Sequence, residues 1–278
     1  MYQNRGFFSN LPDAVRTLLL INISLFVFTV LVERFGLDLN DWLGLHLVGS
    51  SKWMPWQYVT SMFMHGGLSH IFFNMFALYM FGRILEQVWG SKRFIIYYMI
   101  CGIGAGLFHN LVSWFEFNQV LAPCQAFMAD QTPQNLLEIT KHLDNGWFKM
   151  DVICRFIDEW RESGASAAYL GQAVSMVQNI QAEYLKIVEE STVIGASGAV
   201  FGILLAFGML FPNTELYIMF IPIPVKAKYF VIGYALLELY AGVGRIPGDN
   251  VAHFAHLGGM LFGYIILKLW QRSRKKFY

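Results

Sequence analysis

Six stretches of the chain are apolar over close to the length needed to cross a lipid bilayer. Few charges interrupt them, because 56% of the 278 residues are hydrophobic and only 14% are charged. In hydrocarbon only helices or closed barrels satisfy the backbone, and the alternation expected of barrel strands is absent. We therefore predict an all-α membrane protein with six transmembrane helices. The stretches are 15–32, 69–87, 94–114, 196–212, 227–243 and 255–271.

The basic residues predict the orientation of these spans. Arginine and lysine are enriched in cytoplasmic loops. With six spans all four basic groups fall on one side, which places both termini in the cytoplasm and the protein in a cell membrane, plasma or inner. No small-residue cleavage site follows the first span, so we expect a retained helix there and not a signal peptide. The groups are Arg5 and Arg16; Arg83, Lys92 and Arg93; Lys226 and Lys228; and Arg272, Arg274, Lys275 and Lys276.

A polar insertion separates the third and fourth spans. Apolar residues recur at helical spacing from Leu170 to Val188, which predicts a long amphipathic helix. Two shorter helices are expected around 136–143 and 152–160. The predicted parts are an N-terminal membrane part at 1–114, an extracytoplasmic, mostly helical insertion at 115–193, and a C-terminal membrane part at 194–278.

The three cysteines leave two states open. Cys124 and Cys154 both lie in the insertion, on the expected oxidising side, whereas Cys101 lies inside the third span. A Cys124–Cys154 disulfide and two free thiols are both compatible with this spacing.

Four polar residues lie at corresponding depths in the second, fourth and sixth spans. These spans run in the same direction, and each carries its polar residues near its start. Ionisable groups inside a membrane are candidates for a functional site. We therefore expect them to share one site just below the extracytoplasmic surface. They are His70, Asn74, Ser197 and His256.

Glycines provide faces on which the fourth and sixth spans can meet. Gly198 and Gly202 are four residues apart, as are Gly259 and Gly263, and this pattern lets membrane helices approach closely. The histidine of the sixth span falls on the same helical face as its two glycines. If the two glycine faces pack together, this imidazole reaches the serine of the fourth span.

A serine beside a histidine supports acyl transfer. Ser197 would attack, with His256 as general base and later as general acid. The sequence shows no acid near the start of the sixth span except Asp249, outside it, so we predict a dyad and not a triad. His70 and Asn74, one helical turn apart, are candidate oxyanion donors, with the backbone N–H of the serine as a third.

The histidines also raise the question of a metal site. His65 with His70, or His253 with His256, could act as ligands, but no cysteine or acid completes either set. We therefore predict no metal and no other cofactor, and the absence of a basic patch gives no reason to expect nucleic acid. His253 is the nearest rival to His256 as the base, but it lies before the predicted helix.

Three motifs, taken in this order, resemble those of the rhomboid intramembrane serine proteases. They are the segment from His65 to Asn74, Gly195-Ala196-Ser197-Gly198, and Ala255-His256-Leu257-Gly258-Gly259. The resemblance covers roughly 50–114 and 191–271. It implies a six-helix bundle with a water-filled cavity that opens to the extracytoplasmic side.

The resemblance also implies roles for individual residues. The serine and the histidine of the dyad keep the roles given above. Oxyanion stabilisation would fall to His70, Asn74 and the backbone around Gly195, and Phe201 matches the aromatic residue on which the imidazole stacks. Substrates would be single-span proteins of the lipid bilayer, cut near the end of their helix. The fifth span (227–243) is similar in position to a helix that gates lateral entry.

Two features depart from the family pattern. Trp56-Gln57 stands where many members have Trp-Arg, so contacts of that arginine are missing. The insertion between the third and fourth spans is unusually long. Neither departure touches the serine or the histidine.

Two other functions fit a polar site in a helical bundle less well. A proteolytically inactive relative would bind membrane helices as a scaffold or quality-control protein, but loss of the serine or histidine would be expected, and both are present. A transporter or channel would need polar residues at both depths, whereas the cytoplasmic halves of the second, fourth and sixth spans are apolar. An intramembrane endopeptidase is the leading prediction.

Overall fold

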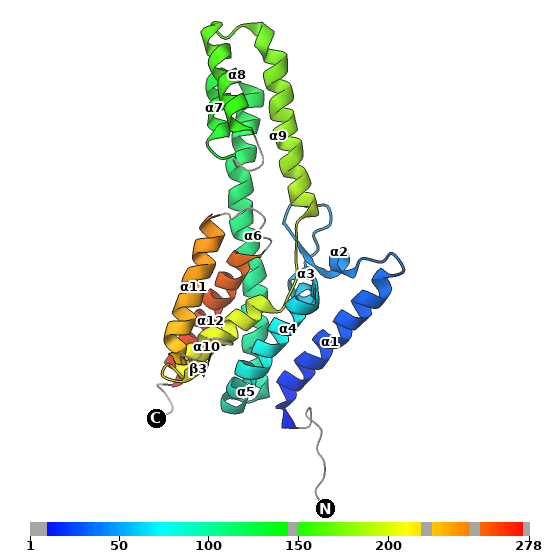
Figure 1. Ribbon diagram of the computed structural model, residues 1–278, viewed down its shortest axis with the longest axis vertical. Coiled ribbons are helices and arrows are strands. Elements are labelled where there is room, and N and C mark those ends of the chain that lie inside the picture. The colour runs from blue at the N-terminus through cyan, green and yellow to red at the C-terminus, as the bar shows by residue number, and fades with distance from the viewer. Residues whose placement is uncertain (1–9, 144–148, 218–223, 245–250, 275–278) are drawn as a thin grey trace, which may run out of the picture. The chain divides into compact units, whose positions relative to one another are not determined.

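The computed structural model describes residues 10–143, 149–217, 224–244 and 251–274. Helices dominate these residues, and the strands form two short antiparallel pairs (Figure 1). The long helix α6 (Ser91–Ala129) contributes to both of the compact units into which the chain divides. The membrane unit comprises 1–46, 52–109 and 192–278, and the insertion unit comprises 47–51 and 110–191.

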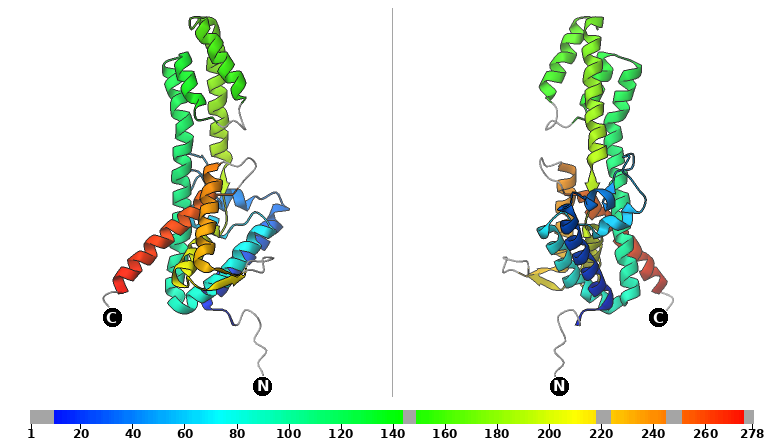
Figure 2. Two further views of the ribbon diagram at one scale, coloured as in Figure 1. Left: turned by 60° about the vertical axis from the view of Figure 1, so that its left-hand side comes forward. Right: turned by 90° about the vertical axis from the view of Figure 1, so that its right-hand side faces the viewer.

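The membrane unit is a bundle of helices with two short β-ladders. Helix α10 packs most extensively against α12, and α11 packs against both of them. Figure 2 shows α11 and α12 from two further sides. The helices are α1 (Asp13–Glu33), α2 (Leu39–Leu43), α3 (Gln57–Thr60), η2 (Ser61–Phe63), α4 (Leu68–Ala77), η3 (Leu78–Gly82), α5 (Arg83–Trp89), α10 (Ser197–Leu210), α11 (Ala227–Gly244) and α12 (His253–Arg274). The strands are β1 (Leu45–His46), β2 (Thr192–Val193), β3 (Glu215–Tyr217) and β4 (Pro224–Lys226).

Helices lie at all six stretches predicted from the sequence. Within the described residues, three of them are long and apolar enough to cross a membrane: Asp13–Glu33, Leu68–Trp89 and Ser91–Ala129. Helix α10 is shorter, since its 14 residues extend only about 21 Å against a hydrocarbon core of about 30 Å. Helices α11 and α12 are long enough, but polar residues within them lower their mean hydropathy.

The membrane unit is apolar inside and on its outer faces. Phe94, Tyr97 and Tyr98 of α6 are fully buried in its core. Large apolar side chains also point outward, such as Val27 and Phe28 of α1. In a soluble protein such faces would promote aggregation, whereas in a multi-pass membrane protein lipid covers them.

A buried carboxylate caps the first helix. The side chain of Pro12, which precedes α1, makes no capping hydrogen bond. Instead Glu86 of α5 accepts hydrogen bonds of 2.8 Å from the backbone N–H groups of Ala14 and Val15, and a third from Ser91. Because the start of a helix carries unpaired N–H groups and partial positive charge, this contact fixes α1 against α5.

The first loop is organised around Gln57, at the position where the resemblance would lead one to expect an arginine. Its side chain is buried, and its amide oxygen accepts hydrogen bonds from the backbone N–H groups of His46 and Met54. Its amide nitrogen donates to the carbonyl oxygens of Trp42 and Lys52. A neutral amide therefore connects both halves of this loop.

The insertion unit contains the helices that its periodicity predicts. The long amphipathic helix is α9 (Leu170–Glu190), and the two shorter ones are α7 (Pro133–Thr140) and α8 (Met150–Glu162). The short turn η4 (Ala167–Tyr169) precedes α9. The boundaries at 109/110 and 191/192 differ by a few residues from those expected at 114/115 and 193/194.

The insertion unit has a hydrophobic core of its own. Phe127 of α6, Leu136 of α7 and Trp160 of α8 are buried in it, together with Val177 of α9. The segment 47–51 also belongs to this unit, since both the backbone N–H and the hydroxyl of Ser51 donate to the Glu189 carboxylate.

The cysteines of the insertion unit are not joined. Cys124 is buried against the core of the unit, whereas Cys154 is exposed on α8, and both are free. Of the two states that the sequence left open, the structure has the one with free thiols.

Candidate active site

The segment before α10 is held in place by a two-residue ladder and a glycine. Strand β2 pairs with β1, with Val193 opposite Leu45, and the backbone N–H of Gly195 donates to the carbonyl oxygen of Ser61 at 2.9 Å. Gly195 has a φ of 127°, which favours glycine strongly. Two residues later Ser197 begins α10, so its hydroxyl lies at the first turn of a helix.

Close packing of glycines brings α12 against α10. A Cβ atom added to Gly259 would collide with the backbone of Gly198, and one added to Gly202 would lie 3.1 Å from the carbonyl oxygen of Gly259. The predicted contact of the two glycine faces is thus present at Gly259. Gly263 differs from the prediction, because it faces Tyr97 and Cys101 of α6, and Tyr97 donates to the Gly202 carbonyl oxygen at 2.8 Å.

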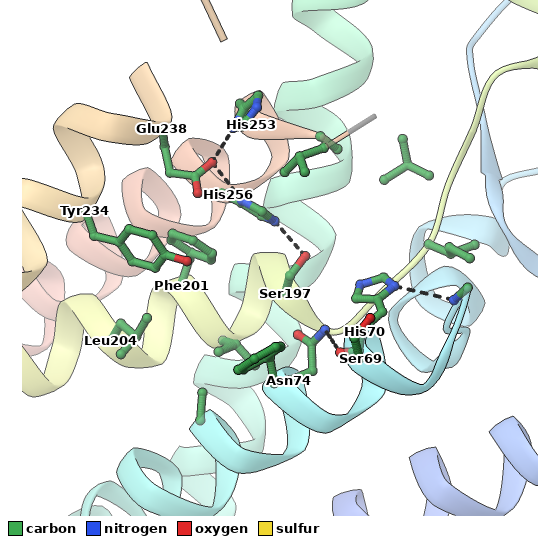
Figure 3. A pocket seen from close by; sticks show the side chains of 18 of the residues that line it. Ser69, His70, Asn74, Ser197, Phe201, Leu204, Tyr234, Glu238, His253 and His256 are labelled. Carbon is green, nitrogen blue, oxygen red and sulfur yellow. Dashed lines mark hydrogen bonds and ion pairs between the residues drawn. The ribbon is translucent and has the colours of Figure 1, made fainter. Parts of the chain in front are cut away.

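This packing places a histidine at the serine. The Nε2 atom of His256 lies 2.8 Å from the Oγ atom of Ser197 (Figure 3). The ring of Phe201 lies almost parallel to the imidazole, with a centroid distance of 4.1 Å and an angle of 8°. Tyr234 of α11 also stacks on Phe201, with a centroid distance of 5.0 Å. The stacked rings restrict how far the imidazole can turn.

An acid that the sequence analysis missed completes this row of side chains. Oε2 of Glu238, on α11, lies 2.8 Å from Nδ1 of His256 and 2.7 Å from Nδ1 of His253. The expectation of a dyad without a nearby acid is therefore wrong in its geometry, and Asp249 lies outside the described residues. The available signal was Glu238 itself, a glutamate well inside the predicted span 227–243.

The structure supplies an acid for the possible metal site at His253 and His256, which the sequence analysis did not find. Glu238, His253 and His256 place one ligand atom each within 4.8 Å of one another, so an acid does complete a set. However, two atoms bound tetrahedrally to one zinc ion at about 2.1 Å lie about 3.4 Å apart. The observed separations of 2.7 and 2.8 Å from the carboxylate oxygen are hydrogen-bond distances instead.

A second group of polar atoms lies on the other side of the serine. The backbone N–H of Gly66 donates to Nδ1 of His70 at 3.4 Å, which leaves the proton of a neutral ring on Nε2. That Nε2 atom would lie 2.7 Å from a Cβ atom added to Gly195, and the Oγ of Ser197 would lie 3.6 Å from the same point. The ring nitrogen and the hydroxyl thus border one small volume.

Asn74 is fixed by its own helix and also borders the cavity. Its amide nitrogen donates to the carbonyl oxygen of His70 at 2.9 Å, one helical turn earlier. The side chain is buried and lines the same cavity as Ser197. One of its two amide protons remains to serve a bound group.

His65 packs against His70 and supports its ring. Its buried ring packs edge-on against His70, with the centroids 5.1 Å apart. Burial, together with the neighbouring His70, lowers the pKa of His65 to about 4, so this imidazole is neutral at physiological pH.

A cavity of about 680 Å³ joins these groups (Figure 3). Its polar wall contains Ser197, His256, Glu238 and His70, and its apolar wall includes Phe73 and other side chains from α4 and α10. Such a mixture of an apolar surface and a few convergent polar groups is typical of a site that binds and orients an organic ligand.

Comparison with known proteins decides the family. The sequence profile of the Rhomboid domain matches residues 52–116 and 161–272, which is more than half of the chain. The chain belongs to the rhomboid family. The gap in the match falls inside the insertion.

Several curated rhomboid proteins are similar to the chain. An uncharacterized mitochondrial rhomboid protein of Schizosaccharomyces pombe is 27% identical over 232 residues, which are 78% of the chain and 52% of that protein. The rhomboid protease AarA of Providencia stuartii is 31% identical over 108 residues, or 37% of the chain and 38% of that protein. The Arabidopsis thaliana protein named inactive RHOMBOID-like protein 8 is 38% identical over 53 residues, or 19% and 15%. The chain spans about half or less of the length of these relatives.

Proposed function

We propose that this rhomboid protein is an intramembrane serine endopeptidase that cleaves single-span membrane proteins near the extracytoplasmic end of their helix. The observation that carries the proposal is the 2.8 Å approach of His256 Nε2 to Ser197 Oγ. A carboxylate can only accept hydrogen bonds, so Nδ1 of His256 carries the proton that it donates to Glu238. The Nε2 atom of the neutral ring is then free of a proton and can accept the serine hydroxyl.

The reaction follows from this arrangement. Ser197 Oγ bonds to the carbonyl carbon of the scissile peptide while its proton moves to His256 Nε2. The C–N bond breaks, and the imidazolium gives that proton to the departing amine. Water then attacks the acyl-enzyme, with His256 taking one proton and returning it to Ser197 Oγ. The products are an acid and an amine.

The developing negative charge falls beside the second polar group. We assign oxyanion stabilisation to His70 Nε2, the remaining amide proton of Asn74 and the backbone around Gly195. A donor of this kind is worth about 10²–10³ in kcat, because its proton already points at the position where the negative charge develops.

The proposed membrane arrangement follows from the helices and the basic residues. The six stretches form one bundle, in which the short α10 leaves Ser197 below the membrane surface. From the basic groups we infer that both termini are cytoplasmic and that the membrane is a plasma or inner membrane; Arg5, Lys275 and Lys276 lie outside the described residues. The name "mitochondrial" belongs to the S. pombe relative.

Family membership does not by itself decide activity, since the family includes a protein named inactive. The presence of both Ser197 and His256, in contact, favours the active form. The test compares the wild type with Ser197→Ala, both purified in detergent and mixed with a fluorogenic single-span substrate. We expect cleavage that the substitution abolishes. Equal cleavage by both proteins would exclude Ser197 as the nucleophile, and no cleavage by either in detergent or bilayers would favour an inactive helix-binding protein.

A further inference from the structure

Helix α11 buries a carboxylate where an apolar side chain would be less costly. The helix carries only two charged residues, Lys228 and Glu238. Its exposed side chains include Leu236, Leu237 and Leu239, which surround Glu238 in the sequence, whereas Glu238 itself is only 6% exposed. Burying a carboxylate costs several kcal/mol unless it is well paired.

The partners of this carboxylate are the two histidines of α12. Both Nδ1 atoms approach the same oxygen, Oε2, at 2.7 Å for His253 and 2.8 Å for His256. Packing alone would be served by leucine at this position. The carboxylate instead contacts Nδ1 of His256, whose other ring nitrogen, Nε2, contacts Ser197. This arrangement indicates that Glu238 supports the contact between His256 and Ser197.

We propose that Glu238 is a positioning residue for His256, so that the site works as a Ser197–His256–Glu238 triad and not as a dyad. The inference rests on the proposed function and extends it to a residue outside the three motifs. The carboxylate acts in two ways: it holds the proton of the neutral ring on Nδ1, and it faces the positive charge that the ring acquires during the reaction.

Glu238 neither accepts nor releases a proton during the proposed reaction. The proton on Nδ1 of His256 stays there throughout, while the serine proton arrives at Nε2 and leaves from it. Because the carboxylate is buried, it stabilises the imidazolium more than an exposed carboxylate in water would. Without the charge, the ring can also adopt the other tautomer, in which Nε2 cannot accept from Ser197.

The triad also makes the base depend on α11. His256 belongs to α12, Phe201 to α10, and Glu238 to α11. The imidazole is therefore correctly oriented only when all three helices are packed together. Helix α11 also supports the imidazole indirectly, because its Tyr234 stacks on Phe201, the ring against which His256 lies. Movement of α11 away from α12 would therefore release the base as well as widen the cavity.

The first part of the test is kinetic. We would measure kcat and KM for Glu238→Gln and Glu238→Asp on the fluorogenic substrate, with the wild type and Ser197→Ala as limits. Loss of a triad carboxylate lowers kcat by roughly 10⁴-fold. We expect such a loss in E238Q with KM changed less than about threefold, and partial recovery in E238D, which restores the charge. The control is Leu237→Gln, which puts the same amide on the exposed side of α11.

The second part reads the imidazole directly and needs no catalysis. Nitrogen-15 spectra of the histidine rings, assigned by loss of one signal in His256→Gln, report which nitrogen carries the proton. We expect Nδ1–H in the wild type and a shift toward Nε2–H in E238Q. His253→Gln, which keeps the carboxylate on His256, should leave the Nδ1–H form in place.

The outcomes separate the two proposals. If E238Q cleaves within threefold of the wild type while S197A is inactive, the triad is wrong and the protease stands. If the wild type cleaves no better than S197A, the proposed protease fails, and the ring spectra alone decide the role of Glu238. If E238Q does not fold, a wild-type His256 ring protonated at Nε2 overturns the inference, and one protonated at Nδ1 upholds it.

Discussion

Gly259 lies directly against the backbone of Gly198, and this contact sets the distance between the helices that carry His256 and Ser197. The serine and the histidine are 59 residues apart in the chain. A side chain at Gly259 would push α12 away from α10, whereas one at Gly198 would first meet Ala105 of α6. The 2.8 Å contact between His256 and Ser197 therefore depends on the missing side chain of Gly259, one helical turn after His256.

Gly259→Ala should lower both stability and activity. The added Cβ would overlap the carbonyl of Gly198, which cannot move without disturbing α10. Such overpacking costs roughly 1–3 kcal/mol, and Gly259→Val should cost more. Thermal unfolding and cleavage rate in detergent measure the two effects. Gly233→Ala is the matched control, because a Cβ there meets no atom within 4 Å. Normal activity in Gly259→Val would contradict the packing account.

Gly195→Ala should impair catalysis more than folding. The new methyl group would lie 2.7 Å from His70 Nε2, in the volume assigned to the oxyanion. It would also require a φ of 127°, which alanine rarely adopts. Gly36→Ala separates these effects, since Gly36 has a φ of 80° but open space around it. We expect Gly36→Ala to lose stability only, and Gly195→Ala to lose kcat at least tenfold. Equal kcat in the two variants would argue against the assigned oxyanion site.

Glu86→Ala should destabilise the membrane unit without altering the active site. It removes the acceptor of the N–H groups of Ala14 and Val15, and buried donors left without a partner cost about 1–3 kcal/mol each. We therefore expect a lower midpoint of thermal unfolding, with kcat of the folded fraction retained. Glu86→Gln keeps one acceptor oxygen, so its midpoint should lie between those of the wild type and Glu86→Ala. An unchanged midpoint in Glu86→Ala would show that the cap contributes little.

The free cysteines predict a simple labelling pattern. Cys154 is exposed, whereas Cys101 and Cys124 are buried. Without any reductant, a water-soluble maleimide should add once to the folded protein, at Cys154, and three times after unfolding. Intact mass counts the additions. Failure of the unreduced, unfolded protein to take up three would reveal a disulfide that the structure lacks.

Much of the fold could be predicted because apolar length and periodicity are local properties of the chain. The six apolar stretches became helices, and Leu170 to Val188 became α9. The two-residue ladder of β1 with β2 could not be predicted, since Leu45 and Val193 are far apart in sequence and such short strands leave no periodic signal. The role of Gln57 was hidden for a similar reason, because its four partners are backbone groups that any sequence offers.

The site was predictable where a polar side chain began a span and not where it lay within one. Ser197 and His256 stood out because each precedes a run of apolar residues. Glu238 lies within the fifth span, and its partners lie on the next helix, α12, 15 and 18 residues later in the chain. Only the packing of α11 against α12 shows that the carboxylate points at the base.

Covalent labelling of the serine tests the central claim most directly. A fluorophosphonate reacts with a serine only where a neighbouring base activates it. We expect the folded wild type to gain one adduct, located by peptide mass spectrometry on Ser197, and to lose cleavage activity in proportion. Ser197→Ala should gain none, and His256→Gln should react far more slowly. An adduct on another serine, or full cleavage activity in a protein that never becomes labelled, would contradict the assignment of Ser197 as a nucleophile activated by His256.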